Sequence, residues 1–232
     1  MSELTTNLNN ILDIKGNIKS AIENKGVDMT GVSFPGYASK IGEISGGGTV
    51  GWDQKSITEG TVEIINLNNS ASFVVSSAFM NNNTIQTVNL PYATSVGNSA
   101  FYRCSSLSQV NLPVCSYIGN RAFNNCSSLS QISLPMCNYI DSYAFNNCGS
   151  LSQLSLPVCS YIGSFAFSYC SSLSIITIGY SSVCSISTSE ILYQTPIASG
   201  TGSIYVPTSL VDAYKSATNW SYFSTRIFPI PE

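Results

Sequence analysis

The chain contains no histidine and very little charge. Its 232 residues include 9 lysines and arginines and 12 acidic residues, so charged side chains make up 9% of the sequence and the net charge is −3. Without an imidazole the chain cannot build a Ser-His-Asp or Cys-His catalytic group or a histidine-ligated metal site. Nine scattered basic residues do not form the basic face that nucleic-acid binding requires. We therefore expect a protein that is not an enzyme, uses no cofactor and binds no nucleic acid.

Long apolar runs are also missing. No stretch of about 18 apolar residues is present, so we expect no membrane insertion. The first residues, Met1–Asn7, lack the basic region and the apolar region of a secretory signal. This leads us to expect synthesis and folding in a reducing cytosol. Aromatic residues nevertheless make up 11% of the chain, which indicates a folded protein rather than a disordered one.

A repeat of about 22 residues dominates the sequence. Each copy has an Ala-Phe pair, then apolar residues six, nine and eleven positions after the phenylalanine, and then usually a proline. The repeating phenylalanines are Phe79, Phe101, Phe123, Phe145 and Phe167. A unit of this length cannot bury its apolar side alone, so the copies must stack on one another.

The second half of each unit has the L-x-x-V-x-L pattern of a short strand. Alternation along it places Val110 and Leu112 inside and Gln109 and Asn111 outside. Stacked copies place equivalent strands about 4.8 Å apart. We therefore predict a solenoid in which identical side chains form rows along the stacking direction.

The consensus unit, I-G-x-x-A-F-x-x-C-S-S-L-x-Q-V-x-L-P-x-C-x-Y, resembles the BspA-like leucine-rich repeat family of bacterial surface proteins over about residues 60–228. The ending, with Ile204–Pro207 and Ser209–Lys215, is similar to the terminal cap of that family. The resemblance implies a β-rich leucine-rich repeat solenoid of 22-residue coils at residues 64–203 and a strand–helix C-terminal cap at residues 204–232. In this cap we expect Trp220, Tyr222 and Phe228 to cover the open end of the core.

Seven of the eight cysteines recur with the same period as the phenylalanines. Cys104, Cys126, Cys148 and Cys170 form a first column, Cys115, Cys137 and Cys159 form a second, and Cys184 belongs to neither. None forms the closely spaced pair typical of zinc sites, so we expect no metal. We favour two columns of small, buried thiols. Disulfides between neighbouring coils are the alternative, because the coil spacing allows them.

Residues 1–45 form a different module. Apolar residues at heptad-like spacing predict a helix over about residues 3–24, with Leu4, Leu8, Ile11, Ile18 and Ile22 as the candidate oligomerisation face. Residues 46–63 follow as a Gly-rich hinge and entry segment. The segment 8–44 is similar to N-terminal segments of phage tail and fibre proteins, which implies attachment or oligomerisation. The alternative is an N-terminal cap of the solenoid.

Rows of exposed residues are the candidate binding surfaces, because aromatic rings and neutral amides suit sugar or protein ligands. The strand face offers Gln109, Gln131, Gln153 and Asn111, beside Thr87, Asn89, Ser133 and Ser155. Two further rows contain Tyr117, Tyr139 and Tyr161, and Tyr102, Asn124 and Asn146. The alternative is that these residues only keep the solenoid soluble. Asp141 takes a position held by glycine in other copies, so we expect a turn role for it.

Two functions fit these features. The first is a non-enzymatic phage virion protein, associated with a tail or head fibre and assembled in the host cytoplasm. It would be a homo-oligomer, with a trimer favoured, would contact other virion proteins through residues 1–45, and would bind a host-surface protein or glycan through its repeats. The alternative is a bacterial cell-surface leucine-rich repeat adhesin for host or matrix binding.

Overall fold

The computed structural model describes residues 64–66, 73–74 and 76–231. The expected helical module at 1–45, with its candidate oligomerisation face, lies outside the described residues. The Gly-rich hinge and entry segment, which we expect at residues 46–63, also lies outside the described residues. The described part comprises the repeats and the C-terminal region.

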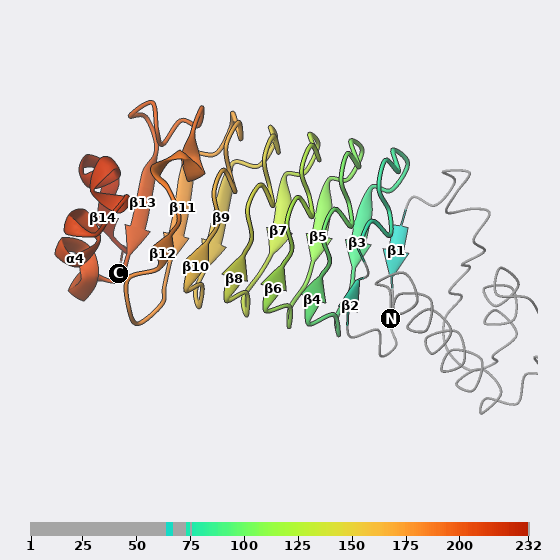
Figure 1. The fold of residues 1–232 in the computed structure, drawn as a ribbon, viewed down its shortest axis with the longest axis horizontal. Coiled ribbons are helices and arrows are strands. Elements are labelled where there is room, and N and C mark those ends of the chain that lie inside the picture. The colour runs from blue at the N-terminus through green and yellow to red at the C-terminus, as the bar shows by residue number, and fades with distance from the viewer. Residues whose placement is uncertain (1–63, 67–72, 75, 232) are drawn as a thin grey trace, which may run out of the picture. The chain divides into compact units, whose positions relative to one another are not determined.

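The strands form two columns of parallel strands, and each coil from β1 to β12 contributes one strand to each column (Figure 1). Strand column 1 contains β1 (Ile64–Asn66), β3 (Thr87–Asn89), β5 (Gln109–Asn111), β7 (Gln131–Ser133), β9 (Gln153–Leu156), β11 (Ile175–Ile178), β13 (Ser203–Val206) and β14 (Ile227–Pro229). Strand column 2 contains β2 (Phe73–Val74), β4 (Ser95–Val96), β6 (Tyr117–Ile118), β8 (Tyr139–Ile140), β10 (Tyr161–Ile162) and β12 (Ser185–Ile186). Equivalent residues face each other, as in the pairing of Val88 with Val110. The predicted stacking in register is confirmed.

The predicted alternation along the strands is also confirmed. Val110 and Leu112 are buried, whereas Gln109 and Asn111 are exposed. The phenylalanines form a continuous internal file: the ring centroids of successive residues from Phe79 to Phe167 lie 5.0 to 5.5 Å apart, and their planes differ by 3° to 14°. Offset stacking of this kind adds to the apolar burial. The file is therefore a main source of cohesion between coils.

A further coil continues the repeat beyond Phe167. The amide of Phe167 donates to the carbonyl of Ile191, just as the amide of Phe145 donates to the carbonyl of Ala166. Leu192 is therefore placed in the position of the phenylalanine, and it is fully buried. The sequence hides this coil because leucine replaces phenylalanine and the step from Phe167 to Leu192 is longer than the regular period.

Column 1 is interrupted between β7 and β9. It consists of the two sheets β1-β3-β5-β7 and β9-β11-β13-β14, while column 2 is one continuous sheet of six strands. At the steps into β5, β7 and β11 the amide before the strand bonds to the preceding coil, as from Ser130 N to Ser108 O (3.0 Å) and from Ser174 N to Ser152 O (2.9 Å). Within the described part of the chain, Ser152 N makes no such bond to Ser130 O. The break coincides with Gly149, where neighbouring coils have serine.

Two positions in each coil adopt a left-handed backbone without using glycine. Their φ values lie between 55° and 63°, and they recur two residues before and two residues after each phenylalanine of the file. The first row is Ser77, Ser99, Arg121, Tyr143 and Phe165, and the second begins with Asn81, Arg103, Asn125, Asn147 and Tyr169. Asparagine tolerates this conformation well, whereas the aromatic and arginine residues adopt it at some cost.

The turn expected at Asp141 is present, since the amide of Ala144 donates to the Asp141 carbonyl at 3.3 Å, as Ala122 N does to the Gly119 carbonyl at 3.1 Å. A left-handed backbone, however, is not the reason why glycine fills this column. Neither Gly119 nor Gly163 has a positive φ. Instead a neighbouring coil approaches closely: a Cβ atom on Gly163 would lie 2.7 Å from the carbonyl carbon of Asp141. Asp141 is accommodated with its carboxylate accepting hydrogen bonds from Ser142 N (2.6 Å) and from the Tyr117 hydroxyl (3.1 Å).

We expect Gly163→Ala to lower the free energy of unfolding by about 1–3 kcal/mol, because the new methyl group must displace the backbone of the preceding coil. The matched control is Gly149→Ala, whose Cβ would meet only the Ser171 hydroxyl at 3.4 Å, an ordinary contact. Urea unfolding of both variants measures the difference. Equal effects of the two substitutions would show that coil approach does not select glycine here.

The C-terminal region closes the end of the core. After β13 come η3 (Thr208–Leu210), α4 (Val211–Ser216) and η4 (Trp220–Arg226), followed by β14. Trp220 Nε1 donates to the carbonyl of Cys184 at 2.6 Å, and the Tyr214 hydroxyl accepts from the amide of the same cysteine at 2.8 Å. The expectation for two other aromatics is wrong, because Tyr222 is 72% and Phe228 39% exposed. Their places in the core are taken by Tyr214 and Phe223, which are buried.

Candidate functional site

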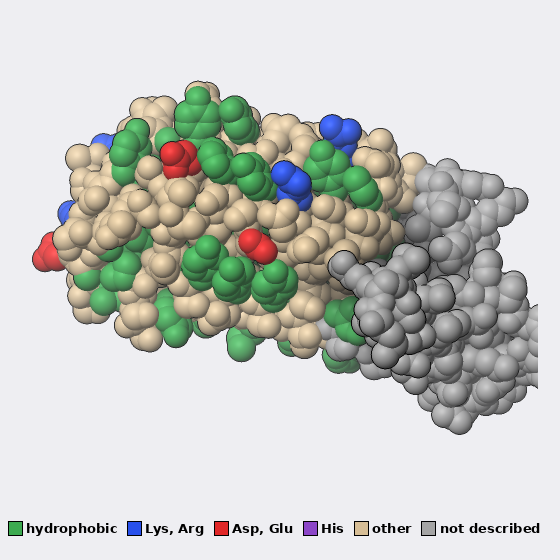
Figure 2. Space-filling view, viewed as in Figure 1, with side chains coloured by type: hydrophobic (Ala, Val, Ile, Leu, Met, Phe, Trp, Pro, Cys, Tyr) green, Lys and Arg blue, Asp and Glu red, His purple; other side chains and the backbone are tan. Residues whose placement is uncertain are grey.

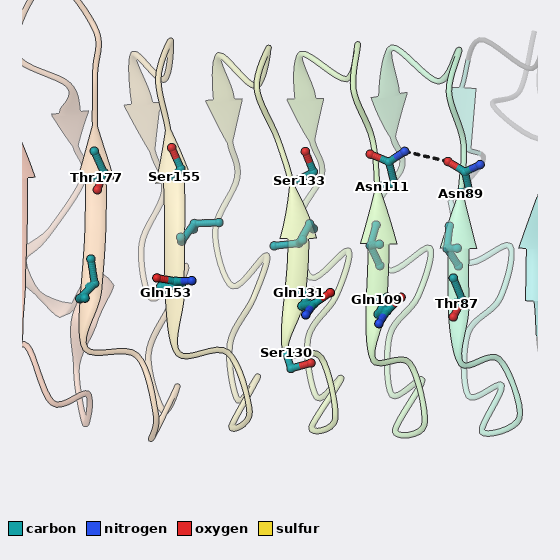
Figure 3. Close-up of a pocket in the computed structure, with 15 residues that line it drawn as sticks. Thr87, Asn89, Gln109, Asn111, Ser130, Gln131, Ser133, Gln153, Ser155 and Thr177 are labelled. Carbon is teal, nitrogen blue, oxygen red and sulfur yellow. Dashed lines mark hydrogen bonds between the residues drawn. The ribbon is translucent and has the colours of Figure 1, made fainter.

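A shallow groove of about 690 Å³ runs across β3, β5, β7, β9 and β11 in column 1 (Figure 3). We call it the polar groove. Its walls are rows of neutral polar side chains, and none of its lining residues is charged. The first row is Thr87, Gln109, Gln131 and Gln153, and the second is Asn89, Asn111, Ser133, Ser155 and Thr177.

The rows follow directly from the sequence period. Alternate positions of each strand point outward, and the pairing places Gln109 opposite Gln131 and Asn89 opposite Asn111. The side-chain amide of Asn111 donates to Asn89 Oδ1 at 2.8 Å, which fixes the orientation of both (Figure 3). The structure thus brings together the four strand-face candidates of the sequence analysis. Extending the repeat by one coil beyond Ser155 would also have predicted Thr177 as a lining residue of the groove.

The floor of the groove is apolar and changes at the break between β7 and β9. Val110 and Leu154 are buried, whereas Ile132 between them is only half-buried. Ser130, whose carbonyl receives no bond from Ser152 of the next coil, also lines the groove. Sequence reasoning missed Ser130 and Ile132, because in the repeat they look the same as their equivalents in other coils.

The tyrosine row lies on column 2 and takes no part in the groove. Ring centroids of Tyr117 and Tyr139 lie 5.4 Å apart, and those of Tyr139 and Tyr161 lie 4.5 Å apart. The Tyr117 hydroxyl bonds to Asp141, and burial together with this carboxylate raises the pKa of Tyr117. Charged side chains are sparse over the face seen in Figure 2. The row is a second, separate candidate surface.

In the third candidate row, the prediction that Asn124 is exposed is wrong. Asn124 is only 5% exposed, and its side-chain oxygen accepts a hydrogen bond from the side-chain amide of Asn125. Asn146 and Tyr102 are half-buried, and the guanidinium carbon of Arg103 lies 5.1 Å from the centre of the Tyr102 ring. This row therefore does not present a continuous binding surface.

The eight cysteines are free, buried thiols. Those of the first column donate to phenylalanine carbonyls of the preceding coil: Cys104 Sγ to Phe79 O (3.0 Å), Cys126 Sγ to Phe101 O (3.0 Å), Cys148 Sγ to Phe123 O (3.2 Å) and Cys170 Sγ to Phe145 O (3.1 Å). These bonds join neighbouring coils. No group of three metal-ligating side chains occurs among the residues that the structure describes.

Cys184 lies outside the register of both columns, as the sequence predicts, because Ser185 pairs with Tyr161 and Cys184 is therefore opposite Ser160. Its sulfur nevertheless contacts the sulfur of Cys159. The hydrogen bond between their sulfurs lowers the pKa of Cys159 and, together with burial, raises the pKa of Cys184. Elsewhere burial raises the pKa of Cys104 to about 12 and that of Cys115 to about 11.

The chain is similar to known proteins in both sequence and structure. The model of the BspA type leucine rich repeat region matches residues 58–174 and 94–209 with six copies. A leucine rich cell surface protein from Faecalibacterium prausnitzii shares 25% identity, with a TM-score of 0.50, over 67% of this chain and 46% of that one. A leucine-rich repeat protein from Bacteroides ovatus has a TM-score of 0.58 at 24% identity, over 73% and 43% of the two chains.

The chain therefore spans less than half the length of these two solved proteins. No curated protein matches the sequence significantly. Over the described residues, no helix has both the length and the hydropathy needed to cross a membrane. None of the matches supports the phage-like N-terminal segment or the virion hypothesis, and the cell-surface alternative fits them better. Because the repeat model covers more than half of the sequence, the chain belongs to the BspA-type leucine-rich repeat family.

Proposed function

We propose that the chain is a non-enzymatic adhesion module displayed at a bacterial cell surface, and that it binds an extracellular ligand through the polar groove. The observation that carries the proposal is the alignment of neutral polar side chains over five successive strands of column 1. The family match and the solved cell-surface relative support the location. These comparisons favour this reading over a virion protein.

The physical basis of such binding is repetition on a stiff support. Each hydrogen bond to a neutral group contributes only about 0.5–1.5 kcal/mol, so a single polar contact holds little. The paired strands fix the backbone positions from which several such groups project, which reduces the ordering cost of binding. Display of many copies on one surface multiplies the effect through effective concentration.

Binding by the full-length chain should depend on the groove. We expect the combined substitutions Gln109→Ala, Gln131→Ala and Gln153→Ala to weaken adhesion of protein-coated beads at least about tenfold, because three side-chain amides are removed. Immobilised mucin, collagen and neutral polysaccharides serve as the test surfaces. The measurement is the number of beads retained under flow.

A matched triple variant on column 2 provides the control. Tyr117→Ala, Tyr139→Ala and Tyr161→Ala remove the other exposed row and should leave adhesion unchanged. If the tyrosine variant loses adhesion and the glutamine variant keeps it, the groove is not the binding surface. Circular dichroism establishes that both proteins are folded.

We retain homo-oligomerisation through residues 1–45 as part of the proposal, with a trimer favoured. Light scattering of the full-length chain should then give about three times the monomer mass, and deletion of residues 1–44 should give a monomer, because the apolar stripe at Leu4, Leu8 and Ile11 is removed. A monomeric full-length chain would contradict this part of the proposal without affecting the groove.

A further inference from the structure

The proposed function leaves the chemistry of the ligand open. We infer that the polar groove binds a linear, uncharged polysaccharide that lies across the strands, with about one sugar residue per coil. The inference rests on the proposed function and identifies the class of ligand for the same site. Three properties of the groove carry it: its lack of charge, its repeat distance and its free amides.

The groove has nothing to neutralise a charged ligand. All of its polar lining residues are glutamine, asparagine, serine or threonine. A charged group brought against this surface would lose hydration without gaining an opposite charge, which is unfavourable. Amides and hydroxyls both donate and accept hydrogen bonds, as sugar hydroxyls do. The surface is therefore matched to a neutral polyhydroxyl ligand.

The repeat distance favours a sugar chain over a peptide. Successive coils are about 5 Å apart at the phenylalanine file, where ring centroids are separated by 5.0 to 5.5 Å, and strand pairing carries this spacing to the groove on either side of the step from β7 to β9. An extended peptide repeats its side-chain direction only every two residues, about 6.8 Å, so it falls out of step with the coils. A pyranose residue in an extended chain advances by close to one coil. Each sugar then lies opposite one coil, and the three middle coils each offer it a glutamine.

Three consecutive amides are available to such a chain. The side chains of Gln109, Gln131 and Gln153 are exposed and make no hydrogen bonds to other described residues. Between them the half-buried Ile132 interrupts the polar surface, and Ile175 is 37% exposed at one end of the groove. The apolar C–H faces of sugar rings can pack against these side chains while the hydroxyls bond to the glutamines.

The test is titration calorimetry of the full-length protein with gluco-oligosaccharides of two to six residues, joined by β-1,4 or β-1,3 bonds, and with β-1,4 manno-oligosaccharides. For at least one series we expect affinity to rise with each added sugar up to about five, the number of strands across the groove, and then to level off. Polygalacturonate, a linear polymer with one carboxylate per sugar, should not bind.

Gln131→Ala, in the middle of the row, should weaken binding of the hexasaccharide about tenfold. Gln86→Ala is the matched control, because Gln86 is exposed and does not line the groove. It should leave the affinity unchanged. Equal losses in both variants would count against the inference.

The outcomes separate the inference from the function on which it rests. Any of three results would overturn the inference that the ligand is a neutral polysaccharide. They are no binding of any of the three neutral series, an affinity that does not depend on chain length, and tighter binding of polygalacturonate. If mucin or collagen then bound and the triple glutamine variant abolished that binding, the groove would be a protein-binding surface and the proposed function would stand. If the triple glutamine substitution changed the binding of no ligand, both the polysaccharide inference and the proposed function would be wrong.

Discussion

Raising the pH above about 9 should unfold the coils steeply, because their cysteines stay protonated when folded. Burial raises the pKa values of Cys104 and Cys115 to about 12 and about 11, and those of Cys126, Cys137 and Cys148 also upward. An unfolded thiol ionises near its ordinary value of about 8.5–9. Below that pH the thiols with raised pKa values hold the proton in both states, so they do not change the stability. Above it only the unfolded state releases the proton, so stability falls with rising pH.

The expected size is large because the thiols act together. Each thiol that stays protonated in the folded state contributes a slope of about 1.4 kcal/mol per pH unit. With Cys184, six cysteines have raised pKa values, which gives about 8 kcal/mol per pH unit. A domain is typically stable by about 5–15 kcal/mol. Unfolding should therefore be complete by about pH 11, measured by circular dichroism under reducing, oxygen-free conditions.

A double alanine variant identifies the cause of this transition. Cys115→Ala with Cys137→Ala copies the first coil, where Ala93 occupies the same column and is buried. We expect the variant to unfold at higher pH and over a broader range, because two ionising groups are removed. A midpoint that does not move would assign the transition to tyrosines or the backbone instead.

Phe123→Ala should lower the free energy of unfolding by about 3–5 kcal/mol, with loss of ring stacking adding up to about 1 kcal/mol for each neighbour. Phe123 is fully buried, and its ring lies 5.1 Å from that of Phe101 and 5.2 Å from that of Phe145. Its removal leaves a cavity in the middle of the file, where neither neighbouring coil can close it. Urea unfolding of purified protein measures the change.

Phe73→Ala is the matched control, since the same side chain is 54% exposed there. We expect a change of less than about 1 kcal/mol. Similar losses for the two variants would mean that the internal file does not hold the coils together. A sloping, two-step curve for Phe123→Ala would instead indicate that the repeats on either side unfold separately.

The repeat made much of the fold predictable, because period and alternation together determine which residues are buried. Val110 and Leu112 inside and Gln109 outside follow from two rules, one for strands and one for stacking. Where a coil departs from the consensus, the rules fail. Leu192 in place of phenylalanine hid a coil, and the longer step before Ser185 hid the contact between Cys184 and Cys159.

Other features depend on contacts between neighbouring coils, and the sequence of a single repeat does not show these contacts. The left-handed backbone at Arg121 and Tyr143 has no glycine to mark it. The glycine at position 163 is required by the approach of another coil, and only coordinates show that distance. The groove rows were predictable, since they repeat the same outward positions. The burial of Asn124 was not, because Asn146 has the same side chain at the same place in the next coil and is only half-buried.

The interruption between β7 and β9 has a mechanical consequence. At the remaining steps from β3 to β11, strand pairing in both columns resists separation of neighbouring coils. At this one step column 1 has no strand pairing, so the load passes to column 2, where β8 pairs with β6 and β10, and to turn bonds such as that from Asn125 N to Asn146 O (2.9 Å). A tensile force applied along the stacking direction is thus concentrated at this junction. The molecule has a built-in point of first rupture, located beneath the centre of the surface that we assign to the ligand.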